Sequence, residues 1–312
     1  MLTIKSILLF IHIFIMFHIL SGSEYLLKPI ISNYEINKSI PHKIYEKQYT
    51  GWGVTVLAPK KVAIQREVKL AIIDSGIDKN HPDLQDVVIA EKNVIYPDRD
   101  ISDDTGHGTG IAGIIAANDN SFGISGVSSS IPLKIYSIKA FENDKSKDDY
   151  ILEALTWAIE ENVDLINMSL GSQSSDQRVE KLLDKAYSKN IIIVAAAGNN
   201  LNGKVDFPAS NQNVISVGAI NSDFSKVPFT SYGKIDFVGP GENILTTFPN
   251  NKYGYISHTS AATAFVSGAV ANYISQFESK EEYTVKEVRK KLENNAINLG
   301  NPELFGKGLI QN

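Results

Sequence analysis

Short apolar runs alternate with stretches of helical periodicity from Val68 towards the end of the chain. Strands that alternate with helices of 10–15 residues indicate βαβ units, in which the crossover helices cover both faces of a parallel sheet. The predicted fold class is therefore α/β, with a mostly parallel central sheet between two helical layers. Strands are expected at Val68–Asp74, Ile131–Ala140, Val163–Leu170, Ile191–Ala197 and Val214–Ile220, and helices at Thr109–Ala117, Tyr150–Glu161, Arg178–Lys189 and Ser260–Phe277.

The composition favours one domain and excludes several kinds of protein. With 312 residues, 43% of them hydrophobic, the chain can fill one large core, and no repeat or linker divides it. The absence of cysteine excludes disulfides, thiolate metal sites and a cysteine nucleophile. A net charge of −5 without a basic stripe argues against nucleic-acid binding.

The N-terminus has the pattern of a secretory signal peptide over residues 1–23. Lys5 precedes the apolar run Ile7–Leu20, and small residues follow it at Ser21–Ser23. The run is short for a membrane-spanning helix, which needs about 20 apolar residues, and it contains His12 and His18. We expect a secreted or cell-surface protein. An uncleaved membrane anchor and an intracellular location are the alternatives.

Three segments could supply the parts of an activated serine. Asp74 ends the first predicted strand, while His107 and Ser260 each lie where a loop enters a predicted helix. A serine hydroxyl becomes a good nucleophile when a histidine can take its proton and a buried carboxylate fixes that histidine. A turn-capping aspartate and a structural histidine are the alternatives. The order Asp, His, Ser is one of three in which this triad occurs.

Seven segments in matching order resemble the subtilisin-family serine proteases from Gln48 to the C-terminus. The resemblance implies a three-layer subtilisin-like fold and a serine endopeptidase that works through an acyl-enzyme. It divides the chain into the signal peptide, a short extension or propeptide at 24–47 and a catalytic domain at 48–312. The matching segments are Ile72–His81, Gly106–Thr109, Asn118–Val127, Met168–Gly171, Ala195–Asn200, Val238–Ile244 and Thr259–Gly268.

By this resemblance, Asp74 orients the imidazole of His107, which is the general base and then the general acid. Ser260 is the nucleophile at the first turn of a helix, where backbone N–H groups favour developing negative charge. Asn199 donates its side-chain N–H to the oxyanion. The alternative for Asn199 is an asparagine in a tight turn after Gly198.

The resemblance also implies where a peptide substrate binds. Ser169, Leu170 and Gly171 match the strand that pairs with an extended substrate backbone. Asp206, two residues before Pro208, falls at the bottom of the pocket for the side chain before the scissile bond, called P1. A carboxylate there would pair with Arg or Lys and disfavour apolar side chains. A solvated loop aspartate is the alternative.

A structural Ca²⁺ site is a further implication of the resemblance. The loop that follows the helix of His107 matches the family's calcium loop, and Ca²⁺ takes six to eight oxygen ligands. A polar turn without metal is the alternative. The implied ligands are the carbonyls of Asn118, Phe122 and Ile124, the amide of Asn120, Asp83, and Gln48 from the N-terminal arm.

The chain departs from the family pattern around the predicted nucleophile. His258 replaces a glycine, Ala264 replaces a proline, and Gly110 stands where a second histidine is common. These changes leave the triad intact but bear on efficiency and specificity. The segment 24–47 is too short for a folded propeptide, and Leu26–Ile30 resembles the short blocking extension of intracellular subtilisins.

The leading hypothesis is a processing endopeptidase with a preference for basic P1 residues, similar to the lantibiotic leader peptidases. Its partner would be a polypeptide or precursor peptide, with membrane contact only through the N-terminus, and we expect a monomer. A general degradative subtilisin is one alternative. The other is a catalytically impaired scaffold that acts by binding, for which His258 is the supporting feature.

Overall fold

A seven-stranded sheet lies at the centre of the molecule. The computed structural model describes residues 28–29, 40–41, 43–57, 63, 66–201 and 203–311. The sheet order is β3-β4-β2-β5-β7-β8-β9, and all neighbouring strands run parallel. This confirms the predicted parallel sheet. Its strands are β2 Val68–Asp74, β3 Val88–Asn93, β4 Leu133–Lys139, β5 Leu165–Met168, β7 Ile192–Ala196, β8 Ile215–Ile220 and β9 Phe237–Pro240.

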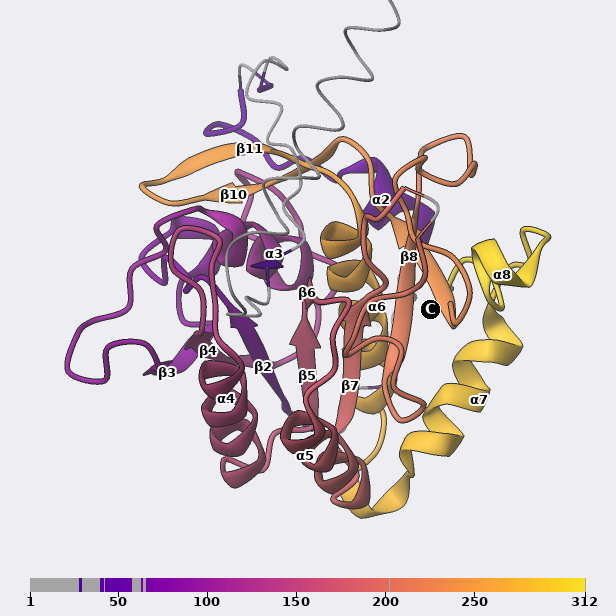
Figure 1. Cartoon of the computed structure of the whole chain (residues 1–312). Coiled ribbons are helices and arrows are strands. Elements are labelled where there is room, and N and C mark those ends of the chain that lie inside the picture. The colour runs from indigo at the N-terminus through magenta and orange to yellow at the C-terminus, as the bar shows by residue number, and fades with distance from the viewer. Residues whose placement is uncertain are drawn as a thin grey trace, which may run out of the picture.

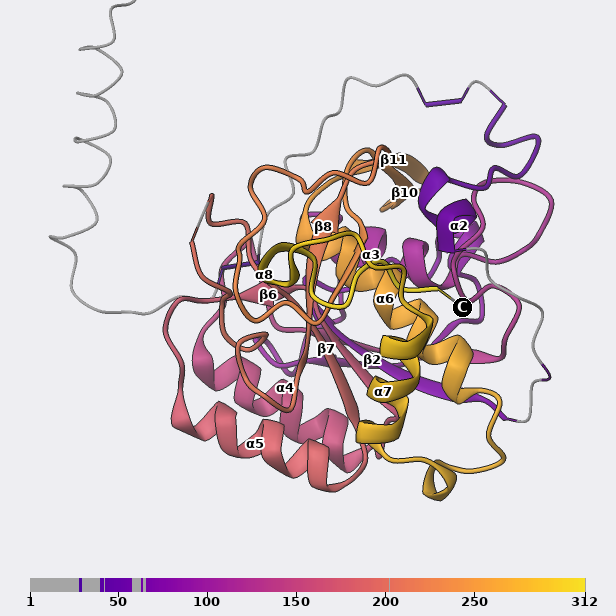
Figure 2. The same cartoon turned by 90° about the vertical axis from the view of Figure 1, so that its right-hand side faces the viewer.

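Helices cover both faces of this sheet (Figure 1). Figure 2 shows α4 (Asp148–Glu160) and α5 (Gln177–Ser188) on one side of the strands, and α6 (Thr259–Ile274) and α7 (Val285–Asn295) on the other. Successive β2 side chains alternate between the two layers, because side chains of a strand point to opposite faces. Leu70 and Ile72 belong to the core with α6, whereas Ala71 and Ile73 belong to the core with α4 and α5. The three-layer prediction is confirmed.

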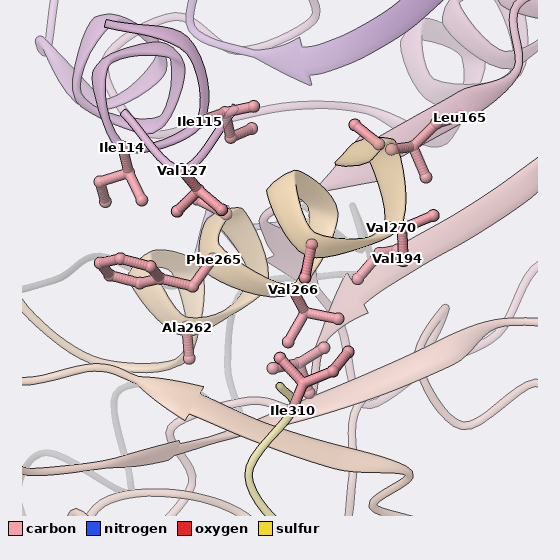
Figure 3. Packing of buried hydrophobic residues seen from close by; sticks show 14 of the residues in the cluster. Ile114, Ile115, Val127, Leu165, Val194, Ala262, Phe265, Val266, Val270 and Ile310 are labelled. Atoms are coloured by element: carbon pink, nitrogen blue, oxygen red, sulfur yellow. The ribbon is translucent and has the colours of Figure 1, made fainter. Parts of the chain in front are cut away.

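Helix α6 is the central element of the larger core. Its residues are apolar or small, and nearly all are buried, so it is apolar around its whole circumference. Figure 3 shows Phe265 near Val127 and Val266 near Ile310, while Val270 lies beside Leu165 and Val194 of the sheet. Helix α3 (His107–Ala116) packs in the same layer. The core therefore holds the N-terminal ends of α3 and α6 in place, and these ends carry two of the predicted catalytic residues.

An antiparallel hairpin, β10 (Ile244–Phe248) with β11 (Lys252–Ile256), lies over α3. Thr246 Oγ1 donates a hydrogen bond of 2.6 Å to the Gly110 carbonyl, and Thr247 Oγ1 donates one of 2.8 Å to the Thr109 carbonyl. The hairpin thus fixes the first turns of α3 from the side opposite the sheet. The helices α2 (Trp52–Leu57) and α8 (Pro302–Phe305) complete the described fold.

One predicted strand, Val163–Leu170, is divided in two. Strand β5 ends at Met168, and the chain continues as β6 (Leu170–Gly171), which leaves the main sheet. Strand β6 instead pairs antiparallel with β1 (Lys28–Pro29). The sequence pattern did not indicate this division, because an apolar run predicts burial but carries no information about which neighbouring strand it pairs with.

The predicted signal peptide 1–23 lies outside the described residues, as does most of the extension 24–47. In the part of the chain that the structure describes, no helix has the length and apolar character needed to span a membrane.

Candidate active site

Asp74 and His107 meet at the carboxyl end of β2. His107 is the first residue of α3, and its Nδ1 lies 2.7 Å from Asp74 Oδ1. Both side chains are buried, with 3% of Asp74 and 1% of His107 exposed. Burial acts to lower the pKa of His107, but Asp74, with the charges of Asp103 and Asp144, outweighs it, and the net pKa is raised. The carboxylate accepts a hydrogen bond from Nδ1–H and so fixes this tautomer, which leaves the lone pair on Nε2 for a general base.

Glycines on both sides of His107 allow this close approach. Gly106 precedes α3 with a φ of 79°, a conformation that side chains other than glycine rarely adopt. A Cβ atom on Gly108 would lie 2.1 Å from the Gly76 carbonyl oxygen. Only glycine therefore lets α3 begin directly against the end of β2. The Gly-His-Gly pattern is a packing requirement of the Asp74–His107 pair.

Ser260 is the second residue of α6 and faces the start of β6. Its Oγ donates a 3.3 Å hydrogen bond to the Ser169 carbonyl, and Ser169 Oγ donates a 3.1 Å bond to the Ser260 carbonyl. This reciprocal pair ties the predicted nucleophile to the predicted substrate-binding segment Ser169–Gly171. The N-terminal turn of α6 also provides a positive dipole end for an anionic intermediate.

Asn199 is held by its amide oxygen, and its amide nitrogen is available. Thr259 donates to Asn199 Oδ1 twice, from its backbone N at 3.3 Å and from Oγ1 at 3.0 Å. Within the described residues, the buried Nδ2 of Asn199 has no hydrogen-bond partner. A buried donor without a partner is costly unless a ligand satisfies it. The geometry favours an oxyanion donor over a simple turn asparagine.

Strand β6 already pairs with an extended peptide, which is the chain's own β1. Lys28 is opposite Gly171, and Pro29 is opposite Leu170, in antiparallel register. Pairing of an extended segment with an exposed strand is a common mode of peptide recognition. Leu170 and Gly171 therefore lie where an incoming substrate backbone could pair.

Asp206 lies between the Asn199 loop and the end of β6. Its backbone N donates to the Ala197 carbonyl. The next residue, Phe207, forms two backbone hydrogen bonds with Ser172, in which each backbone N donates to the other residue's carbonyl. Asn200 Nδ2 donates 2.7 Å to Asp206 Oδ1, and the side chain is only 5% exposed. Burial raises the pKa of Asp206 to about 6, against the opposing hydrogen bond from Asn200. Asp206 is thus not a solvated loop aspartate.

Residues of the implied calcium site are joined by hydrogen bonds. Gln48 Nε2 donates to the carbonyls of Asn118 (2.7 Å) and Ile124 (3.2 Å). Asn120 Nδ2 donates 2.9 Å to Asp83 Oδ1, and the Phe122 backbone N donates 3.2 Å to Asn120 Oδ1. The N-terminal arm and the loop after α3 are thereby joined at one point.

The donor set fits a cation that prefers oxygen. Asp83 is completely buried and accepts hydrogen bonds from neutral donors: Asn120, the Ile124 backbone N and the Tyr253 hydroxyl. Across the described residues, Asp83 forms no ion pair, and no three His, Cys, Asp or Glu side chains gather as a metal cluster. A cation site here would have one carboxylate. If the side-chain amides of Gln48 and Asn120 exchanged the positions of their oxygen and nitrogen atoms, the oxygens would face the cation.

Asp103 is a partly buried carboxylate that the sequence interpretation missed. Its Oδ1 accepts from Ser75 Oγ (2.7 Å) and the Gly106 backbone N (2.8 Å). Its Oδ2 accepts from the backbone N (2.8 Å) and Oγ1 (2.6 Å) of Thr109. Ser75 Oγ in turn lies 3.2 Å from Asp74 Oδ1. Burial raises the pKa of Asp103 despite these bonds. The available signal was its position just before a helix start, where aspartate often accepts backbone N–H bonds.

The comparisons with known proteins agree with this geometry. Residues 65–308 match the model of the Subtilase family. Subtilisin amylosacchariticus of Bacillus subtilis subsp. amylosacchariticus is 41% identical over 249 residues, which are 78% of this chain and 64% of that protein. Subtilisin DY of Bacillus licheniformis is 35% identical over 274 residues, which are 84% of this chain and 97% of that protein.

The Major intracellular serine protease of Bacillus subtilis (strain 168) is 39% identical over 216 residues, which are 66% of this chain and 68% of that protein. The chain spans slightly less than two thirds of the length of relatives such as subtilisin amylosacchariticus. The match to the family model nevertheless includes Asp74, His107, Asn199 and Ser260. The chain therefore belongs to the subtilase family, and its three-layer α/β architecture is consistent with the subtilisin-like fold.

Proposed function

We propose that the chain is a serine endopeptidase. The observation that carries this proposal is the buried 2.7 Å contact between Asp74 and His107, beside an Asn199 amide whose nitrogen has no partner among the described residues. Membership of the subtilase family supports it. A scaffold that acts only by binding would have no need of a buried, charge-coupled histidine.

In the proposed reaction, Ser260 Oγ attacks the carbonyl carbon of the peptide bond while His107 Nε2 takes its proton. Asn199 Nδ2 donates to the resulting oxyanion. His107 then gives the proton to the leaving amine, the C–N bond breaks, and the acyl-enzyme remains on Ser260. Water, deprotonated by His107, hydrolyses that ester and restores the serine.

The direct test is labelling of the purified protein by a fluorophosphonate, which forms a phosphonyl ester with an activated serine. Digestion and mass spectrometry should place the adduct on Ser260. A folded protein that forms no adduct would contradict the endopeptidase proposal and favour the binding scaffold.

A processing role is the finer proposal. The pocket residue Asp206 is a buried carboxylate, which would select Arg or Lys at P1 and exclude most other bonds. Such restriction suits cleavage of a precursor at one place, as in the lantibiotic leader peptidases, better than general digestion. Extensive hydrolysis of denatured casein at bonds after apolar residues would favour the degradative alternative instead.

We also propose that residues 1–23 direct secretion and that residues 24–47 are a short pro-segment. The pairing of Lys28–Pro29 with β6 supports the second part, because a segment there competes with substrate for the same backbone groups. The mature enzyme would then be a secreted or cell-surface monomer. Membrane contact would come only through the N-terminus. A mature protein that begins at Met1 on N-terminal sequencing would contradict the signal peptide.

A structural calcium ion is proposed at Gln48, Asp83, Asn118, Asn120, Phe122 and Ile124. The ion would neutralise Asp83 and hold the N-terminal arm to the loop, and it would take no part in the chemistry. Removing it with a chelator should lower the melting temperature by about 5 °C or more. The reason is that a calcium concentration about 100-fold above Kd stabilises the folded protein by about 2.7 kcal/mol. Each kcal/mol raises the melting temperature by about 2–4 °C.

Thermal unfolding with and without calcium measures this effect. Asp83→Asn should abolish the calcium dependence of the melting temperature. The matched variant Asp119→Asn, in the same loop but outside the ligand set, should retain it. A wild-type melting temperature that is the same in calcium and in chelator would contradict the site.

Asp103 is proposed as a positioning residue for the Asp74–His107 pair. Its charge acts to raise the pKa of His107, after burial and Asp74, and its hydrogen bonds hold Ser75 and the start of α3. Asp103→Asn should lower kcat/KM by about tenfold, which is the equivalent of about one or two hydrogen bonds. It should also shift the acidic limb of the pH profile to lower pH, because the charge that raises the pKa of His107 is lost. The surface variant Asp100→Asn should change neither kcat/KM nor the pH profile. An unmoved acidic limb would mean that Asp103 serves only to fold the loop.

A further inference from the structure

Asn167 is a polar residue at a position of the sheet where an apolar one is expected. It lies in β5, the middle strand of the sheet, where its neighbours are Ile72 and Val194. Because side chains alternate along a strand, Asn167 shares a face of β5 with Leu165, which packs towards α6 (Figure 3). Asparagine is disfavoured in strands, and burial of an unpaired amide is costly. The amide must be explained by what it contacts.

Both ends of the Asn167 amide are hydrogen-bonded, and the side chain is completely buried. Its Oδ1 accepts a 2.9 Å bond from Ser267 Oγ, and its Nδ2 donates a 3.0 Å bond to Ser169 Oγ. Ser267 lies about two turns after Ser260 in α6, so the two serines occupy the same face of that helix. Ser169 is the residue between β5 and β6. Asn167 therefore joins the break between these strands to the helix that carries the predicted nucleophile.

The bond from Asn167 determines the direction of the hydrogen bond that Ser169 makes. An amide N–H can only donate, so Ser169 Oγ accepts from it and keeps its single proton for another partner. That partner is the Ser260 carbonyl, at 3.1 Å. The Ser169 carbonyl in turn accepts from Ser260 Oγ at 3.3 Å. One buried amide thus orients the hydroxyl that holds the backbone of Ser260 against Ser169.

A role in stability alone explains only one of the two bonds of Asn167. The bond from Ser267 ties β5 to the middle of α6, which an apolar contact such as that of Leu165 also does. The bond to Ser169 instead acts on the first turn of α6, where the predicted nucleophile lies. A displacement of about 1 Å between reacting groups can lower a rate by about 100-fold. The second bond therefore lies where small shifts affect the chemistry.

We propose that Asn167 is a positioning residue for the nucleophile, which acts by directing the Ser169 hydroxyl to the Ser260 carbonyl. The proposal rests on the proposed endopeptidase function. Asn167 acts through Ser169 and is not itself a catalytic residue. Since Ser169 leads directly into β6, the same bond keeps the nucleophile and the predicted substrate-binding strand in a fixed relation. Loss of the amide should therefore slow the attack on bound substrate more than it weakens substrate binding.

The first test compares Asn167→Leu with the wild type on a peptide that the wild type cleaves. Leucine has the same branching as asparagine and suits the apolar face of β5, but it cannot donate to Ser169. We expect kcat to fall by about tenfold or more, while KM changes by less than about threefold. The rate at which a fluorophosphonate labels Ser260 should fall in parallel with kcat.

Asn272→Leu is the matched control. It removes another buried amide from the core around α6, whose Nδ2 donates 3.0 Å to the Val127 carbonyl near the far end of the helix. This variant should lower the melting temperature but leave kcat and the labelling rate unchanged.

Ser169→Ala tests the path from Asn167 to the nucleophile. It removes the hydroxyl through which Asn167 acts, and it should lower kcat by a factor similar to that of Asn167→Leu. The double variant should be slower than Ser169→Ala by no more than about twofold, because the two residues belong to one path and their effects do not add. An amide that only stabilises the fold would not show this coupling in kcat.

Each result has one meaning. A wild-type kcat in folded Asn167→Leu would overturn the positioning role, as would effects of Asn167→Leu and Ser169→Ala that multiply in the double variant. If Asn167→Leu does not fold, a wild-type kcat in Ser169→Ala overturns it equally. Fluorophosphonate labelling separates the two proposals. A wild type that forms no adduct overturns the endopeptidase and the positioning role with it, whereas wild-type labelling with unchanged kcat in the variants overturns the positioning role alone.

Discussion

Ser260→Ala should reduce kcat for peptide hydrolysis by about a million-fold, a magnitude taken from the same substitution in subtilisin itself. The residual rate comes from substrate binding and from the Asn199 donor, which this change leaves in place. The free energy of unfolding should change by no more than about 1 kcal/mol, because the lost hydrogen bond to Ser169 is long at 3.3 Å. Single-turnover kinetics and a thermal melt measure the two quantities.

Two further variants make the result specific to the nucleophile. Ser267→Ala removes another buried hydroxyl of α6, whose Oγ donates 2.9 Å to Asn167 Oδ1, and should lower stability while retaining activity. The double variant of Ser260→Ala with His107→Ala should be no slower than either single variant, because the two groups act as a unit. Full activity in Ser260→Ala would show that another residue is the nucleophile.

The elements that carry the predicted triad could be predicted from sequence because each residue lies in a local pattern. The strand before Asp74 reads as a buried apolar run, and the glycines around His107 indicate a sharp start to a helix. The structure places these elements as predicted, with α3 starting at His107 rather than Thr109. Local sequence is informative here because the packing of β2 against α3 depends on adjacent residues.

Features that depend on distant partners were missed. Nothing near Asp103 indicates that Ser75, 28 residues earlier, would donate to it. Likewise, the substitution at His258 was visible in the sequence, but its contact with Phe229 depends on a loop far along the chain. Strand β3 and helix α7 were also not predicted. Strand β3 has exposed positions and α7 is strongly charged, so neither has the continuous apolar run that indicates a buried element.

Asp206→Asn should lower kcat/KM for a P1-arginine peptide by about 100-fold or more, while a P1-leucine peptide is cleaved at the same rate or faster. The guanidinium would otherwise pair with a buried carboxylate. Neutralising one partner of such a pair leaves the other charge buried and unpaired, which costs about 2–5 kcal/mol. The exposed variant Asp223→Asn should leave both rates unchanged. Initial rates on the two peptides give the measurement.

The pH dependence of the wild-type ratio gives an independent test of Asp206. Burial raises the pKa of Asp206 to about 6, so the carboxyl is mostly neutral at pH 5 and mostly charged at pH 7. The preference for P1 arginine over P1 leucine should therefore strengthen as the pH rises through 6 and then level off. Dividing the two rates cancels the titration of His107, which affects both substrates equally. A ratio that is flat from pH 5 to 7, or equal cleavage after leucine and arginine, would show that Asp206 does not contact the P1 side chain.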